Sequence, residues 1–422
     1  MLTTRPRGTN DFLPGKIEKW QYLEEALRQI SRLYGLQEIR TPIFEQTELF
    51  LRSVGETTDI VEKEMYTFTD RGERSLTLRP EGTAPTVRAF VENKLYADSL
   101  PVKLYYLGPM FRYDRPQAGR YRQFHQYGIE VFGSADAGVD AEVIAMAVDI
   151  FQRLGLKDLI VELNSVGCPK CRPAHLEEMK KFLAPKRQEL CPTCQGRFEK
   201  NPLRILDCKN PACQELVRGV PEITDVLCPE CTEHFAKVRE YLQAFGVSYR
   251  LEPRLVRGLD YYVMTAFEIV AQGIGAQSSI CGGGRYDGLI EQIGGPALPG
   301  IGYATGLERI LAVLEQQGIA LGSRIPVQVF IAALGEEANL KGAVLAQELR
   351  KQGVSVEKDY LGKSLKAQLK TAGRLEAPYV LIIGENELNN QEVILRRMKD
   401  STQTAVKLDS LVEDLLTMIK EG

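Results

Sequence analysis

Eight of the nine cysteines of this 422-residue chain lie within residues 168–231, a segment that interrupts otherwise strand-like sequence. The surrounding stretch, 165–250, is also rich in proline and lysine. Apolar, strand-like runs stop before this stretch and resume after it, so the sheet has to be completed by sequence on both sides of it. We therefore predict a discontinuous core domain, residues 1–164 and 251–320, with a cysteine-rich insertion at 165–250.

The cysteines of the insertion are paired in sequence, three times as C-x-x-C and once more loosely. They are Cys168 and Cys171, Cys191 and Cys194, Cys208 and Cys213, and Cys228 and Cys231. Two such pairs hold a tetrahedral zinc ion from opposite sides, so the eight thiolates predict one or two structural Zn²⁺ sites. The alternative is a set of ordinary reduced thiols. Cys281 is expected near a ligand pocket rather than in a metal site.

Composition limits the partners and the location. The net charge is only −3, so any surface that binds nucleic acid must be locally basic. The sequence contains no uninterrupted apolar run of about 18 residues, and its first residues lack an apolar signal core. We therefore expect no membrane association and a cytoplasmic location.

The first residues predict an α+β domain. Residues 17–34 place apolar side chains on one helical stripe, and Gly35 follows where a left-handed cap would lie. Pro42 makes the next segment an extended edge or interface segment. Closely spaced strand-like runs favour an antiparallel sheet, and they lie at 66–68, 76–78, 104–107, 126–132 and 159–163.

The pattern changes beyond Gly322. Apolar β-rich runs at 327–332, 379–383 and 392–395 alternate with or precede helical patterns at 336–352, 364–372 and 410–420. This alternation predicts a separate small α/β domain at residues 325–422.

The densest chemical pattern is the run from Gly108 to Glu130, which contains four arginines. Guanidinium groups suit phosphates because they donate two parallel hydrogen bonds and stay charged. Alternate residues of a hairpin share a face, so Arg112, Gln126 and Glu130 would point into one pocket. Phe124 offers a flat surface for a purine ring. The run predicts a polyphosphate substrate, and its alternative is an exposed, solvated hairpin.

This run resembles motif 2 of class II aminoacyl-tRNA synthetases, and its full text resembles the histidyl-tRNA synthetase family. The further segments that carry the resemblance are Arg257–Tyr262 with Thr265–Glu268, Cys281–Leu289, Gly300–Arg309 (motif 3) and Thr41–Glu45 (motif 1). The resemblance implies a class II antiparallel sheet flanked by helices, a C-terminal α/β anticodon-binding domain and a homodimer formed through motif 1.

The implied activity is ATP-dependent, AMP-forming histidine–tRNA ligation. Histidine and ATP, with Mg²⁺, would give histidyl-adenylate and pyrophosphate, and histidine would then pass to the 3′-terminal ribose of histidine tRNA. Developing charge on the phosphates calls for fixed cations. The implied catalytic residues are Arg112, Arg257 and Arg309.

The resemblance also assigns the remaining contacts. The implied ATP residues are Arg112, Arg120, Phe124 and Arg309. The implied histidine residues are Glu81, Thr83, Arg112, Gln126, Glu130, Arg257, Tyr261 and Tyr262. Arg115 and Gln117 match positions that meet the tRNA acceptor end.

Alternatives stand beside these assignments. Tyr261 and Tyr262 could be ordinary strand packing, and Gly282–Gly284 a bulge. His125 invites a role as a general base, but it is expected to face away from Gln126 and support the hairpin. The whole chain could also be a histidine-sensing regulatory paralogue of ATP phosphoribosyltransferase, or a zinc-ribbon RNA-binding module. The complete domain at 325–422 and the phosphate-facing arginines argue for the ligase.

Overall fold

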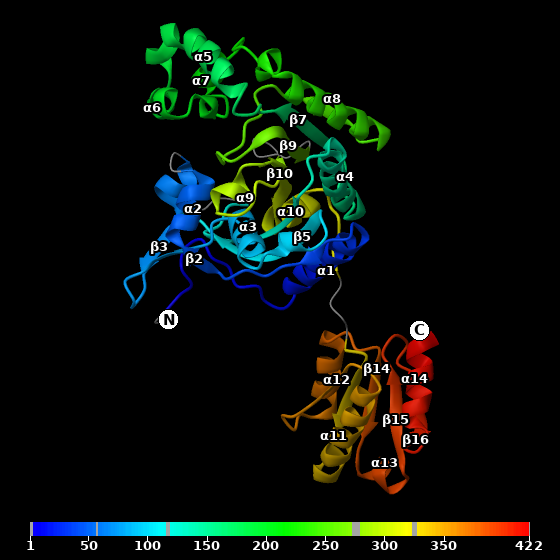
Figure 1. Ribbon diagram of the computed structural model, residues 1–422. Coiled ribbons are helices and arrows are strands. Elements are labelled where there is room, and N and C mark those ends of the chain that lie inside the picture. Colours follow the sequence, from blue (N-terminus) through cyan, green and yellow to red (C-terminus); the bar gives the residue numbers. More distant parts are fainter. Residues whose placement is uncertain (1–2, 56–57, 115–118, 272–278, 323–326, 422) are drawn as a thin grey trace. The chain divides into compact units, whose positions relative to one another are not determined.

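The computed structural model separates into two compact units, residues 1–322 and 323–422 (Figure 1). The residues that it describes are 3–55, 58–114, 119–271, 279–322 and 327–421. None of the helices within these ranges combines the length and the apolar character that a membrane-spanning helix requires.

The first unit is built around an eight-stranded sheet. Across the sheet the strands are β1 (Gln37–Glu38), β5 (Val102–Phe111), β6 (Gln123–Phe132), β11 (Gly300–Gly306), β10 (Ser279–Arg285), β9 (Val263–Ala271), β7 (Leu159–Ser165) and β8 (Tyr249–Leu251). Neighbouring strands are antiparallel except at the two edges, where β1 is parallel to β5 and β8 is parallel to β7. The predicted antiparallel sheet is confirmed, and sequence from both sides of the insertion completes it.

Helices cover the sheet. Those described outside the insertion are α1 (Ile17–Leu33), α2 (Thr47–Val54), the π-helical turn η1 (Ile60–Glu64), α3 (Thr83–Glu92), the 3₁₀ turn η2 (Leu95–Ala97), α4 (Ala137–Arg153), α9 (Leu289–Gln292) and α10 (Leu307–Gln316). The predicted stripe of α1 is buried, and its Leu23 and Leu27 share one apolar cluster with Ile144 of α4. Gly35, with φ of +72°, follows the helix as expected.

The two faces of the sheet pack against different helices, because successive side chains of a strand point to opposite faces. On β6, Ile129 and Val131 pack with α1 and α4 in the main cluster. Phe132 packs instead against Phe90 of α3, with ring centroids 4.6 Å apart. Glu130 shares the α3 face, so it lies on the side opposite the main cluster.

A three-stranded sheet forms at the motif 1 segment, in the order β2 (Phe44–Gln46), β4 (Ser75–Leu78) and β3 (Tyr66–Thr69). Buried Arg79 follows β4 and ties this sheet to the large one. Its guanidinium donates to the carbonyls of Pro109, at 2.9 Å, and Thr41, at 3.0 Å. The segment around Pro42 lies between β1 and β2 and belongs to neither strand, in keeping with a residue that cannot donate to a ladder.

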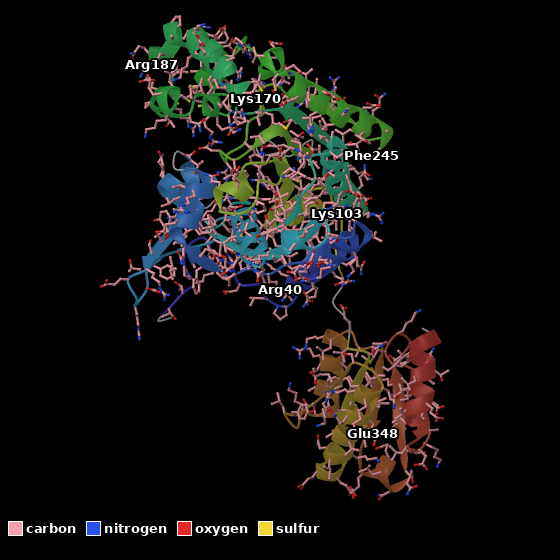
Figure 2. The ribbon with its side chains drawn as sticks, viewed as in Figure 1. Arg40, Lys103, Lys170, Arg187, Phe245 and Glu348 are labelled. Atoms are coloured by element: carbon pink, nitrogen blue, oxygen red, sulfur yellow. The ribbon has the colours of Figure 1, made fainter. Side chains whose placement is uncertain are left out.

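The insertion is helical. Its described elements are α5 (Arg172–Leu183), η3 (Ala184–Glu189), α6 (Pro192–Lys200), η4 (Pro202–Ile205), α7 (Pro211–Leu216), η5 (Ile223–Val226) and α8 (Pro229–Ala244). Helices α5, α6 and α7 gather in one group (Figure 1) around a small apolar cluster that includes Met179. Helix α8 packs Val238 and Leu242 into the main cluster instead. Charged side chains such as Lys170 and Arg187 cover the outside (Figure 2).

The second unit is a five-stranded sheet with helices on both faces. The strand order is β13 (Val356–Lys358), β12 (Val329–Ala333), β14 (Tyr379–Ile383), β15 (Glu392–Arg397) and β16 (Gln403–Lys407). The helices are α11 (Glu336–Lys351), α12 (Leu365–Arg374), α13 (Glu385–Asn389) and α14 (Leu411–Glu421). On β12, Val329 and Ile331 pack with α11 and α14, whereas Phe330 packs with α12. The α/β pattern expected from the sequence is present, with β13, β16 and α13 added to it.

Candidate active site

A cavity of about 910 Å³ opens over the middle of the large sheet. Of the described residues predicted for catalysis, ATP or histidine, all but Glu130 line it. They are Glu81, Thr83, Arg112, Arg120, Phe124, Gln126, Arg257, Tyr261, Tyr262 and Arg309. Cys281 lines it too, as expected. Arg115 and Gln117 lie outside the described residues.

Glu130 lies just behind the cavity wall. Its side chain is fully buried on β6, where Thr83 Oγ1 donates a hydrogen bond to Oε1 at 2.7 Å and the Tyr286 hydroxyl donates to Oε2. Burial disfavours the charged form and raises the pKa of Glu130 to about 8, although both hydroxyl donors oppose the shift. The carboxyl is therefore held in one place by two hydroxyls.

Glu81 marks the beginning of α3. Its carboxylate accepts hydrogen bonds from the backbone N–H groups of Thr83, at 2.7 Å, and Ala84, at 2.9 Å. These are among the donors that the first turn of a helix leaves unsatisfied. Burial nevertheless raises the pKa of the Glu81 carboxyl. A carboxylate fixed in this way on the cavity wall is suited to an ammonium group.

Arg112 and Arg257 bring positive charge to the cavity. Arg112 Nε donates to the carbonyl of Pro80 at 2.8 Å, and burial lowers the pKa of its guanidinium. Burial also works against the charge of Arg257, but the Glu268 carboxylate paired with it, together with Tyr262 and Cys281, outweighs burial and raises the pKa of Arg257. The Nε of Arg257 is buried and has no hydrogen-bond partner among the described residues. A donor of this kind is available to a ligand.

A flat aromatic surface and exposed charge lie at the other end. The guanidinium of Arg112 lies over the ring of Phe124, 5.4 Å from its centroid. Arg309 donates to the carbonyl of Ser279, and burial lowers its pKa. Arg120 is nearly half exposed and pairs with Asp114 at 3.1 Å. This end combines a stacking surface with cations, as a nucleotide requires.

Two glycines make room for the site. A Cβ on Gly302 would lie 2.1 Å from the Glu130 carboxylate, and a Cβ on Gly282 would lie 2.3 Å from the Arg257 guanidinium. Both distances are shorter than a real contact allows. The register of β10 against β9 also shifts between Gly284 and Arg285, so the glycine run contains the expected bulge as well as a functional close approach.

Tyr261, Tyr262 and His125 were each given a packing role as the alternative to a functional one, and their positions in the structure bear on that choice. Tyr261 and Tyr262 pack against each other, with ring centroids 4.7 Å apart, and they also line the cavity. His125 packs its ring edge-on against Phe12 and Trp20, and its Nδ1 lies 3.1 Å from Glu308 Oε1. His125 thus supports the hairpin, as expected.

Three functional neighbours were not predicted. Tyr286 and Glu268 stand inside the quoted signature segments, so their positions in those motifs were an available signal. Arg204 of the insertion donates a hydrogen bond to the main-chain carbonyl of Arg257, which is 53 residues away in the sequence. No local sequence pattern predicts that contact.

The eight insertion cysteines form two groups of four. Cys168, Cys171, Cys228 and Cys231 make one group, and Cys191, Cys194, Cys208 and Cys213 make the other. Within each group all four Sγ atoms lie within 4.8 Å of one another. All nine cysteines of the chain, each in the described residues, are free thiols. The pair at Cys168 and Cys171 is therefore grouped with the pair at Cys228 and Cys231. The two middle pairs form the other group.

The sequence matches known proteins over its whole length. A family model described as "Histidyl-tRNA synthetase" matches residues 8–172 and 212–310, and one described as "Anticodon binding domain" matches 328–418. The "Histidine–tRNA ligase" of Desulforamulus reducens is 63% identical over 412 residues, 98% of each chain. The solved apo histidyl-tRNA synthetase of S. aureus aligns with a TM-score of 0.84 and 41% identity, over 98% of this chain and 100% of the other.

The regulatory alternative is not supported. A Bacillus halodurans structure titled "ATP phosphoribosyltransferase regulatory subunit/histidyl-tRNA synthetase" covers 91% of this chain and 99% of its own, with a TM-score of 0.66. At 22% identity it shows the fold alone. The ligase relative matches the full chain, including the unit that matches the anticodon-binding model. The chain therefore belongs to the histidyl-tRNA synthetase family.

Proposed function

We propose that the cavity joins histidine to tRNA in two steps, with the residue roles set out below. The observation that carries this proposal is that one cavity is lined by three arginines suited to ATP phosphates and by Thr83, which holds the buried Glu130 carboxyl just behind the wall. The oxygen of the histidine carboxylate attacks the α-phosphorus, the bond to the β-phosphate oxygen breaks, and pyrophosphate leaves. Mg²⁺ enters as part of the nucleotide substrate.

The histidine side recognises both polar ends of the substrate. Glu130 and Tyr262 contact the imidazole nitrogens, and Thr83 orients Glu130 through its 2.7 Å hydrogen bond. Glu81 and Gln126 receive the α-amino group, and Gln126 Oε1 is buried without a partner among the described residues. A site whose polar groups need the substrate for satisfaction rejects analogues that lack those groups.

The ATP side stabilises the charge that develops on the phosphates. Arg112 and Arg257 meet the α-phosphate, because both are buried cations on the cavity wall and the Arg257 Nε is free to donate. Arg120 holds the terminal phosphates, and Phe124 stacks with Arg309 around the adenine. Preorganised donors of this kind lower the barrier without reorganising during reaction.

Histidine-dependent exchange of pyrophosphate into ATP tests this proposal. Arg257→Ala should slow exchange roughly 10²- to 10³-fold, the range for removing one charge-stabilising donor, while histidine binding weakens far less. Arg250→Ala is the matched control because Arg250 is exposed and pairs with Glu162 on the sheet edge. Full exchange activity in Arg257→Ala would remove Arg257 from catalysis, and no exchange in folded wild-type protein would remove the first step altogether.

In the second step the terminal ribose hydroxyl of tRNA attacks the carbonyl carbon of the adenylate, and AMP leaves. We assign Arg115 and Gln117 to the acceptor end on their sequence match, and residues 325–422 to the anticodon, a role supported by the matching family model. Deleting this unit is expected to abolish tRNA charging while pyrophosphate exchange persists.

We also propose that each group of four cysteines holds one structural Zn²⁺. Tetrahedral zinc with Zn–S bonds of about 2.3 Å places its sulfur atoms about 3.8 Å apart. Cys168 and Cys228 lie 3.8 Å apart, Cys171 and Cys231 3.7 Å, and Cys191 and Cys208 3.9 Å. Backbone N–H groups also point at the sulfurs, including that of Cys191 toward Cys213 at 3.2 Å. No open ligand position is implied, so the metal orders the insertion.

Metal analysis of the purified protein tests the pairing. Wild-type protein should hold two zinc equivalents per chain, and replacing Cys228 and Cys231 together by serine should leave one, as should replacing Cys208 and Cys213. Cys281→Ser is the control and should retain both. Freely titratable thiols and no zinc in wild-type protein would rule the sites out.

A homodimer through the motif 1 segment is our third proposal. Ile43, Phe44 and Phe68 are all more than two-fifths exposed, and the rings of Phe44 and Phe68 lie 6.4 Å apart. Large apolar side chains gathered at one surface mark interaction sites, and two-fold dimers are the commonest assembly. Sedimentation should give a dimer that Phe44→Asp weakens; a wild-type monomer would contradict the proposal.

A further inference from the structure

The loop of residues 257–262, here called the signature loop, carries Arg257 at its beginning and Tyr262 at its end. It connects to β9 at Val263 and is not itself a strand or a helix. The catalytic arginine and an imidazole contact therefore stand on irregular backbone. Such a segment needs contacts from elsewhere to hold its geometry.

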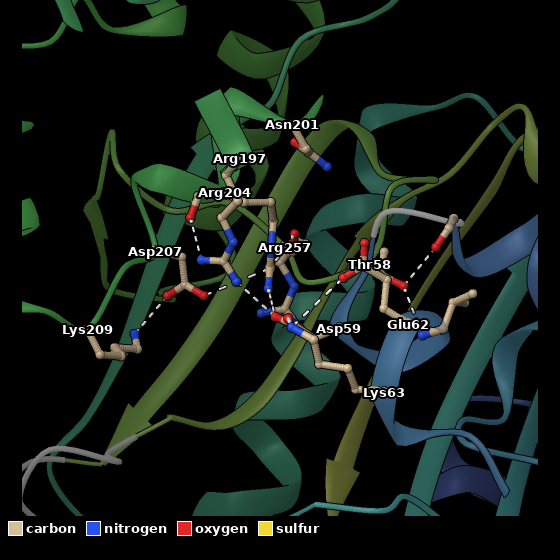
Figure 3. A network of polar contacts seen from close by, with 12 residues as sticks. Thr58, Asp59, Glu62, Lys63, Arg197, Asn201, Arg204, Asp207, Lys209 and Arg257 are labelled. Atoms are coloured by element: carbon tan, nitrogen blue, oxygen red, sulfur yellow. Dashed lines mark hydrogen bonds and ion pairs between the residues drawn. The ribbon is translucent and has the colours of Figure 1, made fainter. Parts of the chain in front are cut away.

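An arginine of the insertion holds the beginning of the signature loop. Arg204 Nη1 donates to the carbonyl of Arg257 at 3.2 Å, and its Nη2 lies 3.4 Å from the Asp59 carboxylate (Figure 3). The Arg204 side chain is only 12% exposed. A Cβ on Gly258 would come within 3.3 Å of its guanidinium, so the loop backbone passes close against it.

A second arginine of the insertion holds the end of the signature loop. Arg172 Nη2 donates to the carbonyl of Tyr262 at 2.6 Å and is also in reach of the carbonyl of Val166, at 3.4 Å. Between the two ends, Asn201 Nδ2 donates to Asp260 Oδ1 at 2.9 Å. The insertion thus contacts the loop at its first, fourth and last residues.

Each of these arginines lies close in sequence to a different group of cysteines. Arg172 directly follows Cys171 of the first group, and Arg204 lies between Cys194 and Cys208 of the second. Arg197, on the same segment as Arg204, pairs with Asp59 at 2.8 Å and donates to the carbonyl of Arg204 at 3.2 Å (Figure 3). The guanidinium fork suits this task because it can bond a carboxylate and a carbonyl together.

We propose that Arg204 and Arg172 are positioning residues for the ligase reaction, forming a two-point clamp in which Arg204 sets the place of Arg257 and Arg172 sets that of Tyr262. This rests on the roles proposed above for Arg257 and Tyr262. The insertion is then part of the adenylation machinery, and the two cysteine groups serve to hold the clamp in register with the loop.

A double-mutant cycle in full-length protein, read by pyrophosphate exchange, tests the first point of the clamp. Arg204→Ala should lower kcat roughly ten- to hundred-fold, as expected for misplacing a catalytic group, with the KM for histidine nearly unchanged. The variant with both Arg204→Ala and Arg257→Ala should be no slower than Arg257→Ala alone, because Arg204 acts through Arg257. Arg204→Lys should recover part of the rate.

The second point gives a different kinetic signature. Arg172→Ala should raise the KM for histidine more than it lowers kcat, and it should add nothing to Tyr262→Phe. Arg218→Ala is the control for both arms, since Arg218 lies in the insertion, is 73% exposed and pairs with Glu215. Thermal unfolding checks that each variant is folded. Asp59→Asn removes the charge of the carboxylate that pairs with Arg204 but leaves Arg204 itself in place. It should therefore lower kcat in the same way as Arg204→Ala, but less strongly.

The outcomes separate the clamp from the proposed function. If Arg257→Ala is slow but Arg204→Ala keeps the wild-type rate, the catalytic role of Arg257 stands and the clamp is wrong. If the rate losses of Arg204→Ala and Arg257→Ala multiply in the double variant, the clamp is also overturned, because Arg204 would then act independently of Arg257. Full activity in Arg257→Ala would overturn both.

Discussion

The two ends of the cavity differ in how they hold polar groups. At the histidine end, Glu130 is fully buried in the sheet and receives hydrogen bonds from Thr83 and Tyr286. At the ATP end, Arg120 is nearly half exposed and pairs with Asp114. One end is closed and already hydrogen-bonded, whereas the other is open and charged.

The difference follows from the two substrates. An imidazole is small and differs from its analogues by single polar atoms, so it has to be recognised by buried groups whose loss of a partner is costly. A triphosphate is large, charged and must release pyrophosphate, so exposed cations suit its terminal groups. The histidine end should therefore be intolerant of change, and the outer ATP end tolerant.

The largest effect is expected at the buried end. Glu130→Gln keeps the volume but replaces one acceptor oxygen by an amide donor, so kcat/KM for histidine should fall roughly 10³-fold, since polar-site mismatches of this kind cost several orders of magnitude. Pyrophosphate exchange at varied histidine measures it. Glu142→Gln is the control because Glu142 is partly exposed and pairs with Lys103. A loss of less than about threefold would mean that the closed end does not select histidine through Glu130.

A smaller effect is expected at the open end. Arg120→Ala should raise the KM for ATP roughly tenfold and leave the affinity for histidine unchanged, because one exposed cation is screened by solvent. Steady-state kinetics at low and high salt measures both, and the difference from wild type should shrink at high salt. Arg153→Ala, an exposed arginine paired with Asp149 on α4, is the control. An effect as large as that of Glu130→Gln would erase the contrast between the two ends.

A separate effect, on stability rather than on activity, concerns pH. The pKa of Glu130, raised by burial to about 8, means that the folded state holds a proton that the unfolded state releases near its ordinary value. The contribution of Glu130 to stability is therefore fully present below about pH 4.5 and is lost as pH rises through about 8. Between pH 5 and pH 8, the melting temperature of wild-type protein should fall relative to that of Glu130→Gln as the pH rises. A difference in melting temperature between the two proteins that does not change with pH would show that burial does not raise the pKa of this carboxyl.

Local patterns predicted much of the fold and site. The stripe on α1, the alternation on β5 and β6, and the cysteine spacing each repeat over a few residues, so they are visible without a structure. Alternation also put Arg112, Gln126 and Glu130 on one face. It did not predict depth, since Arg112 and Gln126 line the cavity whereas Glu130 lies behind Thr83.

The sequence by itself determined which residue types the site contains and that the core is interrupted by a cysteine-rich insertion. Only the tertiary structure decided how the four cysteine pairs combine, that Tyr286 holds Glu130, and that Arg204 reaches the backbone of Arg257. These contacts join residues tens to more than a hundred positions apart in the chain. Their partners are chosen by the path of the backbone and the need of buried polar groups for partners, and neither leaves a periodic mark in the sequence.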